Sequence, residues 1–409
     1  MTEPVAVTGL GLITPAGTDT DATWKVVHAG QGSAASPDPA LAGLPVDFSC
    51  RVPLSAEALD DRVGRASWRM SRNAKLAVVA AREAVRDAGL DPTAWNGDRV
   101  AVVVGCGFGG EAERAAQERR LSEHGPDLIS ALTIPLIIPN MAAGEVAIDL
   151  KAHGPGLATA TACAAGATAI ATAHTLLRAG LCDIAVAGGT EAASSRLTTS
   201  GFWRAGALSQ RTGDITGASR PFAADRDGFV MSEGAGILVL ERYEDAVARG
   251  GEPRALLVGS GSTTDAHHPT APHPDAHSAE KALRTALTMA GLAPHDIDHV
   301  NAHGTSTRLN DAGEAAMIAR ALPHRPSVTA AKGVLGHSLG AAGAVEAALT
   351  VLTVQHGTVP PIANLHAPAP EFDLDCVTGH ARPQNVRTAV THSFGFGGHN
   401  VVLALTRAS

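Results

Sequence analysis

The sequence predicts an α/β protein assembled from two similar halves. Short apolar runs that end in glycine recur along the chain, and each leads into a helix-like segment. The order of these runs in the first part of the chain is repeated in the second part, which indicates an internal duplication. The composition agrees: 45% of the 409 residues are hydrophobic, 18% are charged and 44 are glycine, as in a compact protein with a large core.

Strands are expected at corresponding places in the two halves. In the N-terminal half the apolar runs are Val5–Thr8, Val100–Val104, Leu157–Ala162 and Ile184–Gly189. In the C-terminal half their counterparts are, in the same order, Ala255–Val258, Ile297–Ala302, Ser327–Ala331 and Val390–Gly398. Packing about a pseudo-twofold axis would bring the ends of corresponding strands together. The predicted halves are residues 1–253 and 254–409.

Helices and loops complete each half. Helices rich in small residues are expected at Ala164–Arg178 and Leu339–Val354, each following one of the paired strands. The segment 30–60, rich in Ala, Pro and Ser, and the segment 262–277, rich in Pro and His, are expected to be loops rather than linkers. The chain should therefore form one globular unit.

Charge and cysteine usage exclude several classes of function. The net charge is −8, so no global positive field attracts nucleic acid, and an acidic partner would need a local basic patch. Five scattered cysteines include no C-x-x-C pair, which argues against disulfides and zinc. The N-terminus lacks the features of a signal peptide, and no stretch has the length of a membrane span. We expect a cytoplasmic protein that does not enter a membrane.

A nucleophile is predicted at Cys163, in the sequence Thr161-Ala-Cys-Ala-Ala-Gly166, where a strand turns into a helix. The free N–H groups and positive dipole end of that helix are expected to lower the pKa of the thiol and favour the thiolate. Small neighbours leave room for a substrate chain and for backbone N–H groups near a developing oxyanion. The alternative is a buried cysteine that only packs as a small apolar side chain.

Two histidines and a buried ion pair are candidate partners of this cysteine. His303 follows a strand, and His337 lies between glycines at the start of a helix. Either histidine could instead be structural, but a decarboxylating condensation needs neutral imidazole N–H donors near the enolate oxygen. Lys332 and Glu346 could form a buried pair that tunes the site, or Lys332 could be an ordinary surface lysine.

These motifs together resemble the elongating β-ketoacyl-acyl carrier protein synthases, the type II ketosynthases of the thiolase superfamily. The resemblance extends from Val5-Ala-Val-Thr-Gly-Leu-Gly-Leu-Ile-Thr-Pro15 to Ser393-Phe-Gly-Phe-Gly-Gly-His-Asn400. It implies a thiolase-like α/β fold in which two duplicated βα halves form a layered α-β-α-β-α architecture. It also implies an acyltransferase that performs decarboxylative Claisen condensation of malonyl-carrier protein with a cysteine-bound acyl chain.

The resemblance implies a role for each catalytic candidate. Cys163 would accept the acyl group, His303 and His337 would bind and decarboxylate the extender unit, and Lys332 with Glu346 would support their hydrogen-bond network. Substrates would be carried on phosphopantetheine, with no metal and no separate cofactor.

Further residues are carried over by the same resemblance. Phe396 would be the gate residue whose backbone N–H joins that of the nucleophile in an oxyanion hole. Thr305 and Thr307 would hold the phosphopantetheine arm, and Phe108 and Phe202 would line or gate the acyl pocket.

Departures from the family pattern bear on the pathway. Phe108 is bulkier than the aliphatic residue common in fatty acid enzymes, Ala164-Ala165 replaces a more usual hydroxyl-bearing pair, and His399 replaces a common threonine. These differences favour a type II polyketide pathway, with a polyene product as one form of it. Housekeeping fatty acid elongation is the alternative.

An acyl carrier protein is the expected partner. A cationic cluster at Arg62, Arg65, Arg69 and Arg72 on an acidic chain resembles the family's docking helix, and Arg204 matches a second docking position; a solvated charged face is the alternative. The chain is expected to form a homodimer, or a heterodimer with a subunit resembling a chain length factor.

Three other interpretations compete. Gly105-Cys-Gly-Phe-Gly-Gly110 fits a dinucleotide-binding motif, but without the acidic residue about 20 positions later. Gly336-His-Ser-Leu-Gly340 fits a serine nucleophile elbow, which would make Ser338 the nucleophile of a hydrolase or acyltransferase with partners such as Asp375 and His392. A catalytically silent partner subunit is the non-enzymatic alternative, and the presence of the cysteine argues against it. Four loop histidines lack the spacing of a metal site: His267, His268, His273 and His277.

Overall fold

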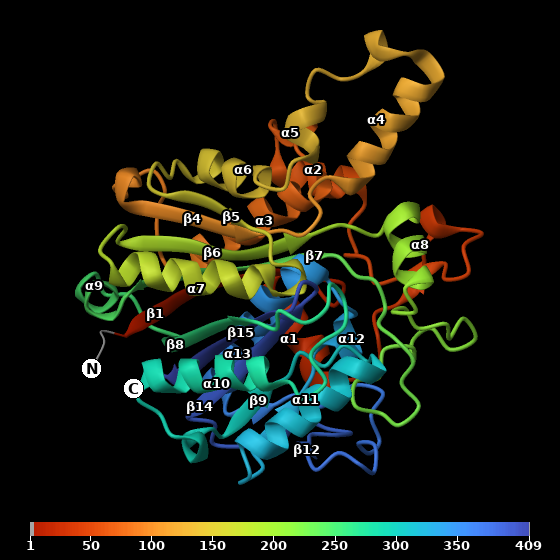
Figure 1. Ribbon diagram of the computed structural model, residues 1–409. Coiled ribbons are helices and arrows are strands. Elements are labelled where there is room, and N and C mark those ends of the chain that lie inside the picture. Colours follow the sequence, from red (N-terminus) through yellow and green to blue (C-terminus); the bar gives the residue numbers. More distant parts are fainter. Residues whose placement is uncertain (1–3, 409) are drawn as a thin grey trace.

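The computed structural model describes residues 4–408 and has the predicted two-half α/β architecture (Figure 1). Its centre is an 11-stranded sheet in the order β12-β10-β9-β14-β15-β8-β1-β7-β6-β4-β5. Outward from the β1–β8 pair, the strands β1, β7, β6, β4 and β5 mirror β8, β15, β14, β9 and β10. Corresponding neighbours also share the same parallel or antiparallel sense. The predicted duplication is therefore confirmed by the strand order.

The strands differ in length between the halves. Those of the N-terminal half are β1 (Val5–Ile13), β2 (Ser36–Pro37), β3 (Phe48–Ser49), β4 (Val100–Gly105), β5 (Gly156–Thr159), β6 (Ile184–Glu191) and β7 (Gly234–Arg242). Those of the C-terminal half are β8 (Ala255–Thr264), β9 (His299–Asn301), β10 (Ser327–Thr329), β11 (Thr358–Val359), β12 (Asp375–Cys376), β13 (Arg382–Pro383), β14 (Thr388–Gly395) and β15 (His399–Arg407).

Helices connect the strands and cover the sheet. The N-terminal half contains α1 (Thr20–Ala29), α2 (Ala56–Val63), α3 (Arg72–Asp87), α4 (Glu111–His124), α5 (Thr133–Ile137), α6 (Met141–Leu150), α7 (Ala165–Arg178), α8 (Arg196–Arg204) and α9 (Tyr243–Ala248). The C-terminal half contains α10 (His277–Ala290), α11 (Arg308–Ala321), α12 (Lys332–Leu335) and α13 (Ala342–His356).

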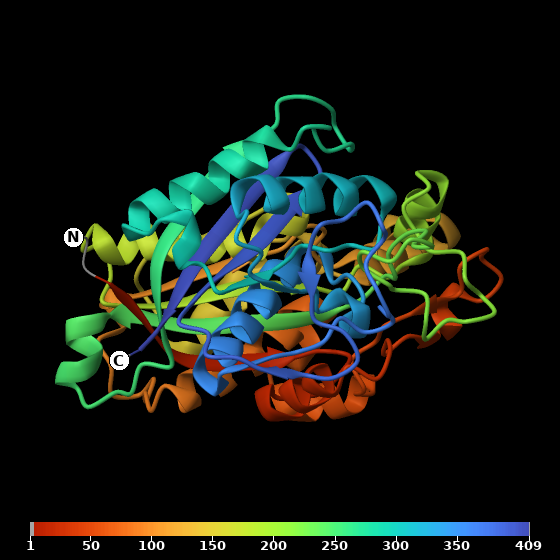
Figure 2. The same cartoon turned by 90° about the horizontal axis from the view of Figure 1, so that it is seen from below.

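Three apolar cores fill the spaces between the layers of helices and strands. Residues of α7 and α13 share a central core with β1 and β15, whereas α3 and α6 form a second core on the outer side of the N-terminal strands. A third core contains α10 and α11, which lie side by side over the C-terminal strands (Figure 2). The layered arrangement of the thiolase-like fold is therefore confirmed, with α7 and α13 as the central helical layer.

The two central helices cross at glycines. A Cβ on Gly166 would lie 2.9 Å from the Ala344 Cβ, and a Cβ on Gly343 would lie 2.9 Å from the Ala167 Cβ. Both distances are shorter than real carbon contacts, so only glycine allows this approach. This crossing brings the N-termini of α7 and α13 together, and with them the turns that carry the candidate site residues.

Some predicted boundaries were wrong. The first strand does not end at Gly9 but continues to Ile13, because Gly9 and Gly11 allow the backbone of α3 to approach; a Cβ on either glycine would collide with an α3 carbonyl oxygen. The expected loop 262–277 begins later, since β8 continues to Thr264. The expected loop 30–60 contains β2, β3 and the start of α2.

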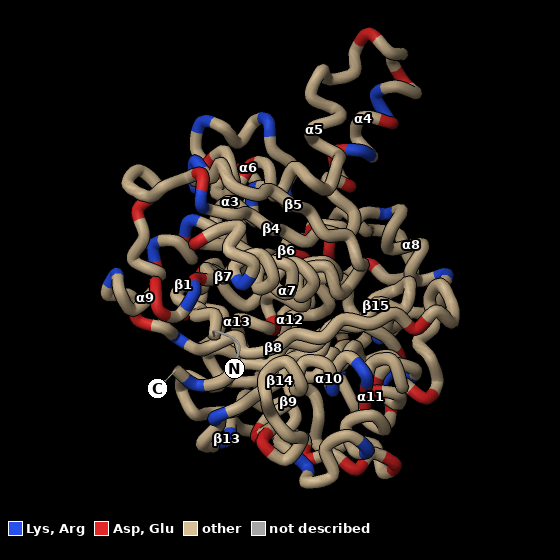
Figure 3. The backbone as a smooth tube through the Cα atoms, turned by 60° about the vertical axis from the view of Figure 1, so that its left-hand side comes forward, with Lys and Arg blue, Asp and Glu red and all other residues tan. Residues whose placement is uncertain are grey.

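The chain passes from one half to the other between Ala248 at the end of α9 and Ala255 at the start of β8. We propose that the division lies at residues 253 and 254, where the mirrored strand order changes sides. Within the N-terminal half, α4 projects from the body of the molecule (Figure 1), and it carries charges of both signs along its length (Figure 3). No helix in residues 4–408 combines the length and apolar character needed to cross a membrane.

Candidate active site

A cavity of about 460 Å³ is lined by side chains from both halves. The N-terminal half contributes the turn between β5 and α7, and the C-terminal half contributes the turns after β9, β10 and β14. Seven of the predicted site residues line this cavity: Cys163, Phe202, His303, Thr305, Thr307, His337 and Phe396.

Cys163 lies in a single 3₁₀ turn, Ala162–Ala164, that leads directly into α7. The residue before it, Ala162, has a φ of 50°, a left-handed conformation that is strained for alanine. Gly395 packs against this turn so closely that a Cβ there would lie 3.1 Å from the Cys163 backbone nitrogen. The sharp turn presents the thiol to the cavity with the end of β14 beside it.

The pKa of Cys163 is raised to about 12, so the predicted lowering of its pKa was wrong. Burial is the largest cause, the Lys332 ammonium opposes it, the Glu191 carboxylate adds to it, and the N–H of Phe396 lowers the pKa. Loss of solvation outweighs the helix N-terminus here. The resting group is therefore the neutral thiol, and its proton must leave during attack on the substrate.

His303 is fixed through its backbone and its ring. The N–H groups of His303 and Gly304 each donate to the Glu314 carboxylate at 2.8 Å. The Lys332 Nζ lies 3.2 Å from His303 Nδ1 and donates to the His303 carbonyl oxygen at 2.6 Å. Because an ammonium can only donate, Nδ1 accepts, and the neutral ring carries its proton on Nε2.

His337 reaches the same arrangement by a different route. Its backbone N–H donates to the Val230 carbonyl at 2.8 Å, which joins it to the strand-like segment before β7. The N–H of Leu339 donates to His337 Nδ1 at 3.3 Å, so its neutral ring also carries the proton on Nε2. The two imidazole centroids lie 5.4 Å apart with an interplanar angle of 82°.

Both imidazoles are held in the neutral form. Burial lowers the pKa of His303 and of His337 well below the usual range, and the Lys332 charge lowers both further. The ammonium itself is buried against Glu346, with both side chains almost fully inaccessible. Burial raises the pKa of Glu346 to about 7, against the effect of Lys332. The site therefore offers two N–H donors beside a thiol, with the cation placed behind them.

Comparison with known proteins agrees with this geometry. The family model for the N-terminal domain of β-ketoacyl synthases matches residues 2–246, and the model for the C-terminal domain matches residues 254–366. The chain belongs to the β-ketoacyl synthase family. It is thus an acyltransferase, a β-ketoacyl-acyl carrier protein synthase that catalyses a carrier-dependent condensation.

The similarity to individual relatives extends over nearly the full length of the chain. A Synechocystis protein named 3-oxoacyl-[acyl-carrier-protein] synthase 2 is 42% identical over 98% of both chains. The solved ishigamide ketosynthase/chain length factor has a TM-score of 0.91 at 34% identity over the full length of both chains. A type II polyketide synthase ketosynthase, solved with its acyl carrier protein, has a TM-score of 0.91 at 30% identity, also over both full lengths.

The remaining predicted substrate residues surround the cavity of the ketosynthase. The hydroxyl groups of Thr305 and Thr307 lie 2.8 Å apart. Phe396 is 37% exposed and its ring lies 6.1 Å from that of Phe202. Phe108 does not line the cavity but packs edge-on against Phe202 with centroids 6.3 Å apart. Phe108 therefore supports the cavity wall from behind, through its contact with Phe202.

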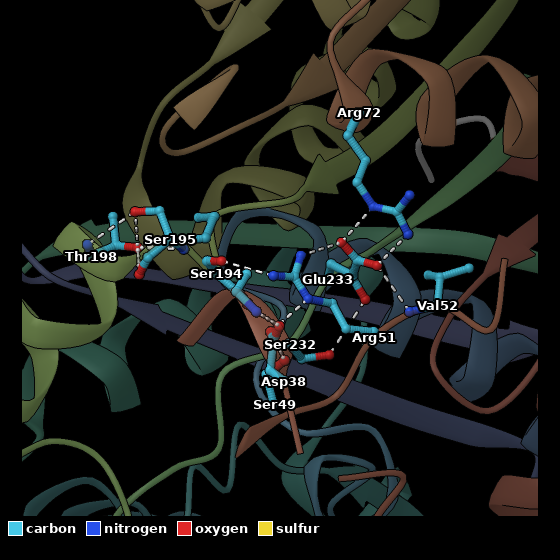
Figure 4. A network of polar contacts seen from close by, with 12 residues as sticks. Asp38, Ser49, Arg51, Val52, Arg72, Ser194, Ser195, Thr198, Ser232 and Glu233 are labelled. Carbon is cyan, nitrogen blue, oxygen red and sulfur yellow. Dashed lines mark hydrogen bonds and ion pairs between the residues drawn. The ribbon is translucent and has the colours of Figure 1, made fainter. Parts of the chain in front are cut away.

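A buried carboxylate supports the strand that holds His337. Glu233 is fully buried and accepts hydrogen bonds from Arg51, Arg72 and the Val52 N–H (Figure 4). The preceding residue, Ser232, donates its backbone N–H to the His337 carbonyl at 3.1 Å. The segment 30–60 is thereby fastened behind the site.

This network also corrects one part of the docking prediction. Arg72 is only partly exposed and pairs with the buried Glu233 carboxylate, so its charge is already partnered within the protein. Arg62 bonds Thr18, and Arg69 pairs with Glu145 at 2.8 Å. Among the predicted docking residues, Arg62, Arg65 and Arg204 are exposed, whereas Arg69 is only partly exposed.

Sequence reasoning missed Glu314 and Glu191. Glu314 lies on the buried face of α11 and holds both the His303 turn and His392, whose Nδ1 is 3.1 Å from the carboxylate. The sequence did contain a signal for Glu314: it lies three and four positions before the apolar residues Met317 and Ile318, which places it on the buried face of the helix. No local signal existed for Glu191, because its partners come from two distant segments.

The serine-nucleophile and dinucleotide interpretations do not fit the structure. The partners proposed for Ser338 are engaged elsewhere, since His392 bonds Glu314 and Asp375 pairs with Arg382. In the glycine-rich loop after β4, the N–H groups of Gly107 and Phe108 donate to Glu191, so a phosphate cannot use them. His267 and His273, in the loop before α10, have ring centroids 4.8 Å apart, and His273 lies 4.3 Å from His277, the first residue of that helix.

Proposed function

We propose that this ketosynthase extends a Cys163-bound acyl chain by two carbons with malonyl-carrier protein as the extender, in a type II polyketide pathway. One observation carries the proposal: a single cavity brings together a thiol from one half and two neutral imidazoles from the other. Lys332 and Glu346 act behind them as the supporting pair.

The reaction follows from these positions. The Cys163 sulfur attacks the acyl thioester, and the carrier thiol leaves with the cysteine proton. Malonyl-carrier protein then enters with its pantetheine arm against Thr305 and Thr307. Loss of carbon dioxide leaves an electron pair in an enolate, whose oxygen accepts the Nε2–H groups of His303 and His337.

Carbon–carbon bond formation completes the cycle. The enolate carbon attacks the carbonyl of the Cys163 thioester, and the N–H groups of Cys163 and Phe396 stabilise the resulting oxyanion. Collapse expels the cysteine sulfur, which regains a proton. The product is a β-ketoacyl chain on the carrier protein.

The polyketide assignment has specific support. The chain is 34% identical over its full length to a chain of the solved ishigamide ketosynthase/chain length factor, and Phe108, Ala164-Ala165 and His399 depart from the fatty acid pattern. Elongation of fatty acids is the second candidate, because the Synechocystis relative carries that type of name at 42% identity. Incubation with malonyl-carrier protein and a series of acyl-carrier proteins, followed by mass analysis, separates the two pathways: the polyketide assignment fails if only saturated fatty acyl primers are extended.

Partners are proposed on two surfaces. Acyl carrier protein would dock near Arg62, Arg65, Arg69 and Arg204. A homodimer, or a heterodimer with a chain length factor, would form at the edge strand β5, where Leu157 is 42% exposed, beside the projecting segment in which Leu121 and Ile134 are 47% and 60% exposed.

Cysteine variants test the chemistry. Cys163→Ala should form no acyl-enzyme by intact mass. Cys163→Gln should lose condensation and retain malonyl decarboxylation, because its histidines remain. A normal acyl-enzyme in Cys163→Ala would refute the proposed function.

A further inference from the structure

A buried carboxylate that the proposed reaction does not use lies beside the active site. Glu191, the last residue of β6, is fully buried. Its hydrogen-bond donors are three backbone N–H groups and one thiol, and none is cationic. The donors are Gly107 at 2.8 Å and Gly340 at 3.3 Å to Oε2, and Phe108 at 3.3 Å and the Cys106 sulfur at 3.4 Å to Oε1.

The two loops that supply these donors are fitted closely around the carboxylate. A Cβ on Gly340 would lie 2.7 Å from the Gly107 nitrogen and 2.8 Å from Glu191 Oε2, and a Cβ on Gly107 would also lie 2.8 Å from Oε2. Neither glycine can therefore be replaced without displacing the carboxylate. This mutual fit, with the absence of a cation among its donors, distinguishes Glu191 from an ordinary buried ion pair.

The internal duplication gives Gly340 a further meaning. Gly340 is the second residue of the 3₁₀ turn Leu339–Ala341, and Cys163 is the second residue of the corresponding turn Ala162–Ala164. At Cys163 the turn lines the substrate cavity. At Gly340 the equivalent N–H is occupied by an anion that the protein itself supplies.

The two loops that Glu191 joins each contact a part of the active site. Phe108 packs against Phe202, which lines the acyl side of the cavity. On the other side, Leu339, adjacent to Gly340, donates to His337 Nδ1 and fixes the ring that carries the Nε2 proton. A change at Glu191 should therefore reach both the cavity wall and the decarboxylating histidine.

We infer that Glu191 is a positioning residue, which joins the loop of Phe108 and the turn after His337 into one rigid unit through backbone N–H groups. The inference rests on the function proposed above, since it requires His337 to act in decarboxylation. Glutamine cannot replace this carboxylate, because its NH₂ group would face N–H donors.

Kinetics of Glu191→Gln test the inference. Condensation kcat should fall about ten- to a hundredfold, the range expected for a small misplacement of catalytic groups, with a much smaller change in the KM for malonyl-carrier protein. In a Cys163→Gln background, malonyl decarboxylation should fall by a similar factor. The kcat/KM ratio between a short and a long acyl-carrier substrate should also change severalfold, which a general loss of stability would not cause.

Glu241→Gln is the matched control. Glu241 is also a buried carboxylate, but it lies at the opposite end of β7, where it binds Arg249 and Thr8. Its replacement should lower the melting temperature. It should leave unchanged the condensation kcat, malonyl decarboxylation and the kcat/KM ratio between short and long acyl-carrier substrates. If folded Glu191→Gln matches the parent in kcat and decarboxylation, or if Glu241→Gln loses the same activities, the inference is wrong.

A second variant covers the case in which Glu191→Gln does not fold. Gly340→Ala pushes against the same carboxylate from the other loop and should reproduce the kinetic changes; failure of both variants to fold assigns Glu191 a purely structural role and overturns the inference. Failure of the proposed function is separable, because it would appear as normal acyl-enzyme in Cys163→Ala with Glu191 intact.

Discussion

The turns at Cys163 and Gly340 have nearly the same backbone but different chemistry. Each begins with a non-glycine residue in the left-handed region, Ala162 at φ 50° and Leu339 at φ 48°, and each leads through a 3₁₀ turn into a central helix. One turn presents a thiol to the substrate, and the other presents an N–H to Glu191. Duplication thus supplied two equivalent helix starts: one carries the proposed nucleophile, and the other holds the imidazole of His337 through the Leu339 N–H.

Removal of the buried cation behind the two imidazoles should have the largest effect. Lys332→Ala leaves Glu346 buried without its partner, which should cost about 3–5 kcal/mol of stability, and frees the Nδ1 of His303 from its donor. Decarboxylation in the Cys163→Gln background should fall at least about a hundredfold. Lys75→Ala, at a partly exposed pair with Asp60, is the control and should cost about 0–1 kcal/mol.

Alkylation kinetics can test whether the Cys163 turn activates its thiol. With a pKa of about 12, the thiolate fraction rises about tenfold per pH unit across the neutral range. The rate of iodoacetamide labelling at Cys163, followed by peptide mapping, should rise accordingly between about pH 7 and pH 9. If the labelling rate is already constant above pH 7, the thiol pKa is instead lowered, as expected from the helix N-terminus.

The equivalence of the two helix starts can be tested at their glycines. Gly166→Ala and Gly343→Ala each place a Cβ 2.9 Å from an alanine Cβ of the opposite helix, and overpacking of this kind costs about 1–3 kcal/mol. The two losses in chemical denaturation should be similar. Gly201→Ala in α8, where a Cβ meets no neighbour within 4 Å, should instead stabilise by about 0.5–1 kcal/mol. A large loss at one crossing glycine alone would break the comparison.

The smallest effect concerns pH and the two imidazoles. The folded-state pKa values of His303 and His337 lie well below the unfolded value of about 6.5, so below that pH the unfolded chain binds more protons. Their contribution to stability is complete above about pH 6.5 and declines as the pH falls below it, by at most about 1.4 kcal/mol per pH unit for each histidine. Unfolding of His337→Asn should show a shallower acid decline than the parent. The rate of decarboxylation should not fall to half as the pH is lowered to 6.5, because both imidazoles are still neutral there.

Local patterns were sufficient for the repeated succession of strands along the chain and for the places of the main candidates. Cys163, His303, His337 and Lys332 all follow apolar runs and precede small residues, so their position at strand ends was readable, and the duplication indicated that these ends meet. The limits of the strands were less predictable. A glycine such as Gly9 can end a strand, or it can lie within a strand where a helix backbone approaches closely, as α3 does here.

The environment of the site was not predictable from local patterns. The direction of the Cys163 pKa depends on how much solvent the opposite half excludes, and the helix N-terminus alone gave the wrong sign. Glu191 and Glu233 are fixed by partners up to about 180 residues away in the sequence, such as Arg51 for Glu233. Long-range contacts of this kind leave no periodic signal in a single sequence.

The division of the site between the halves has a consequence for synthesis on the ribosome. The N-terminal half emerges first with its cysteine but without either imidazole or the lysine, all of which lie beyond residue 300. If the proposed mechanism holds, a nascent or truncated chain cannot consume malonyl units prematurely. In that mechanism, activity arises only when α13 packs against α7, so catalytic competence itself reports that the second half has folded onto the first.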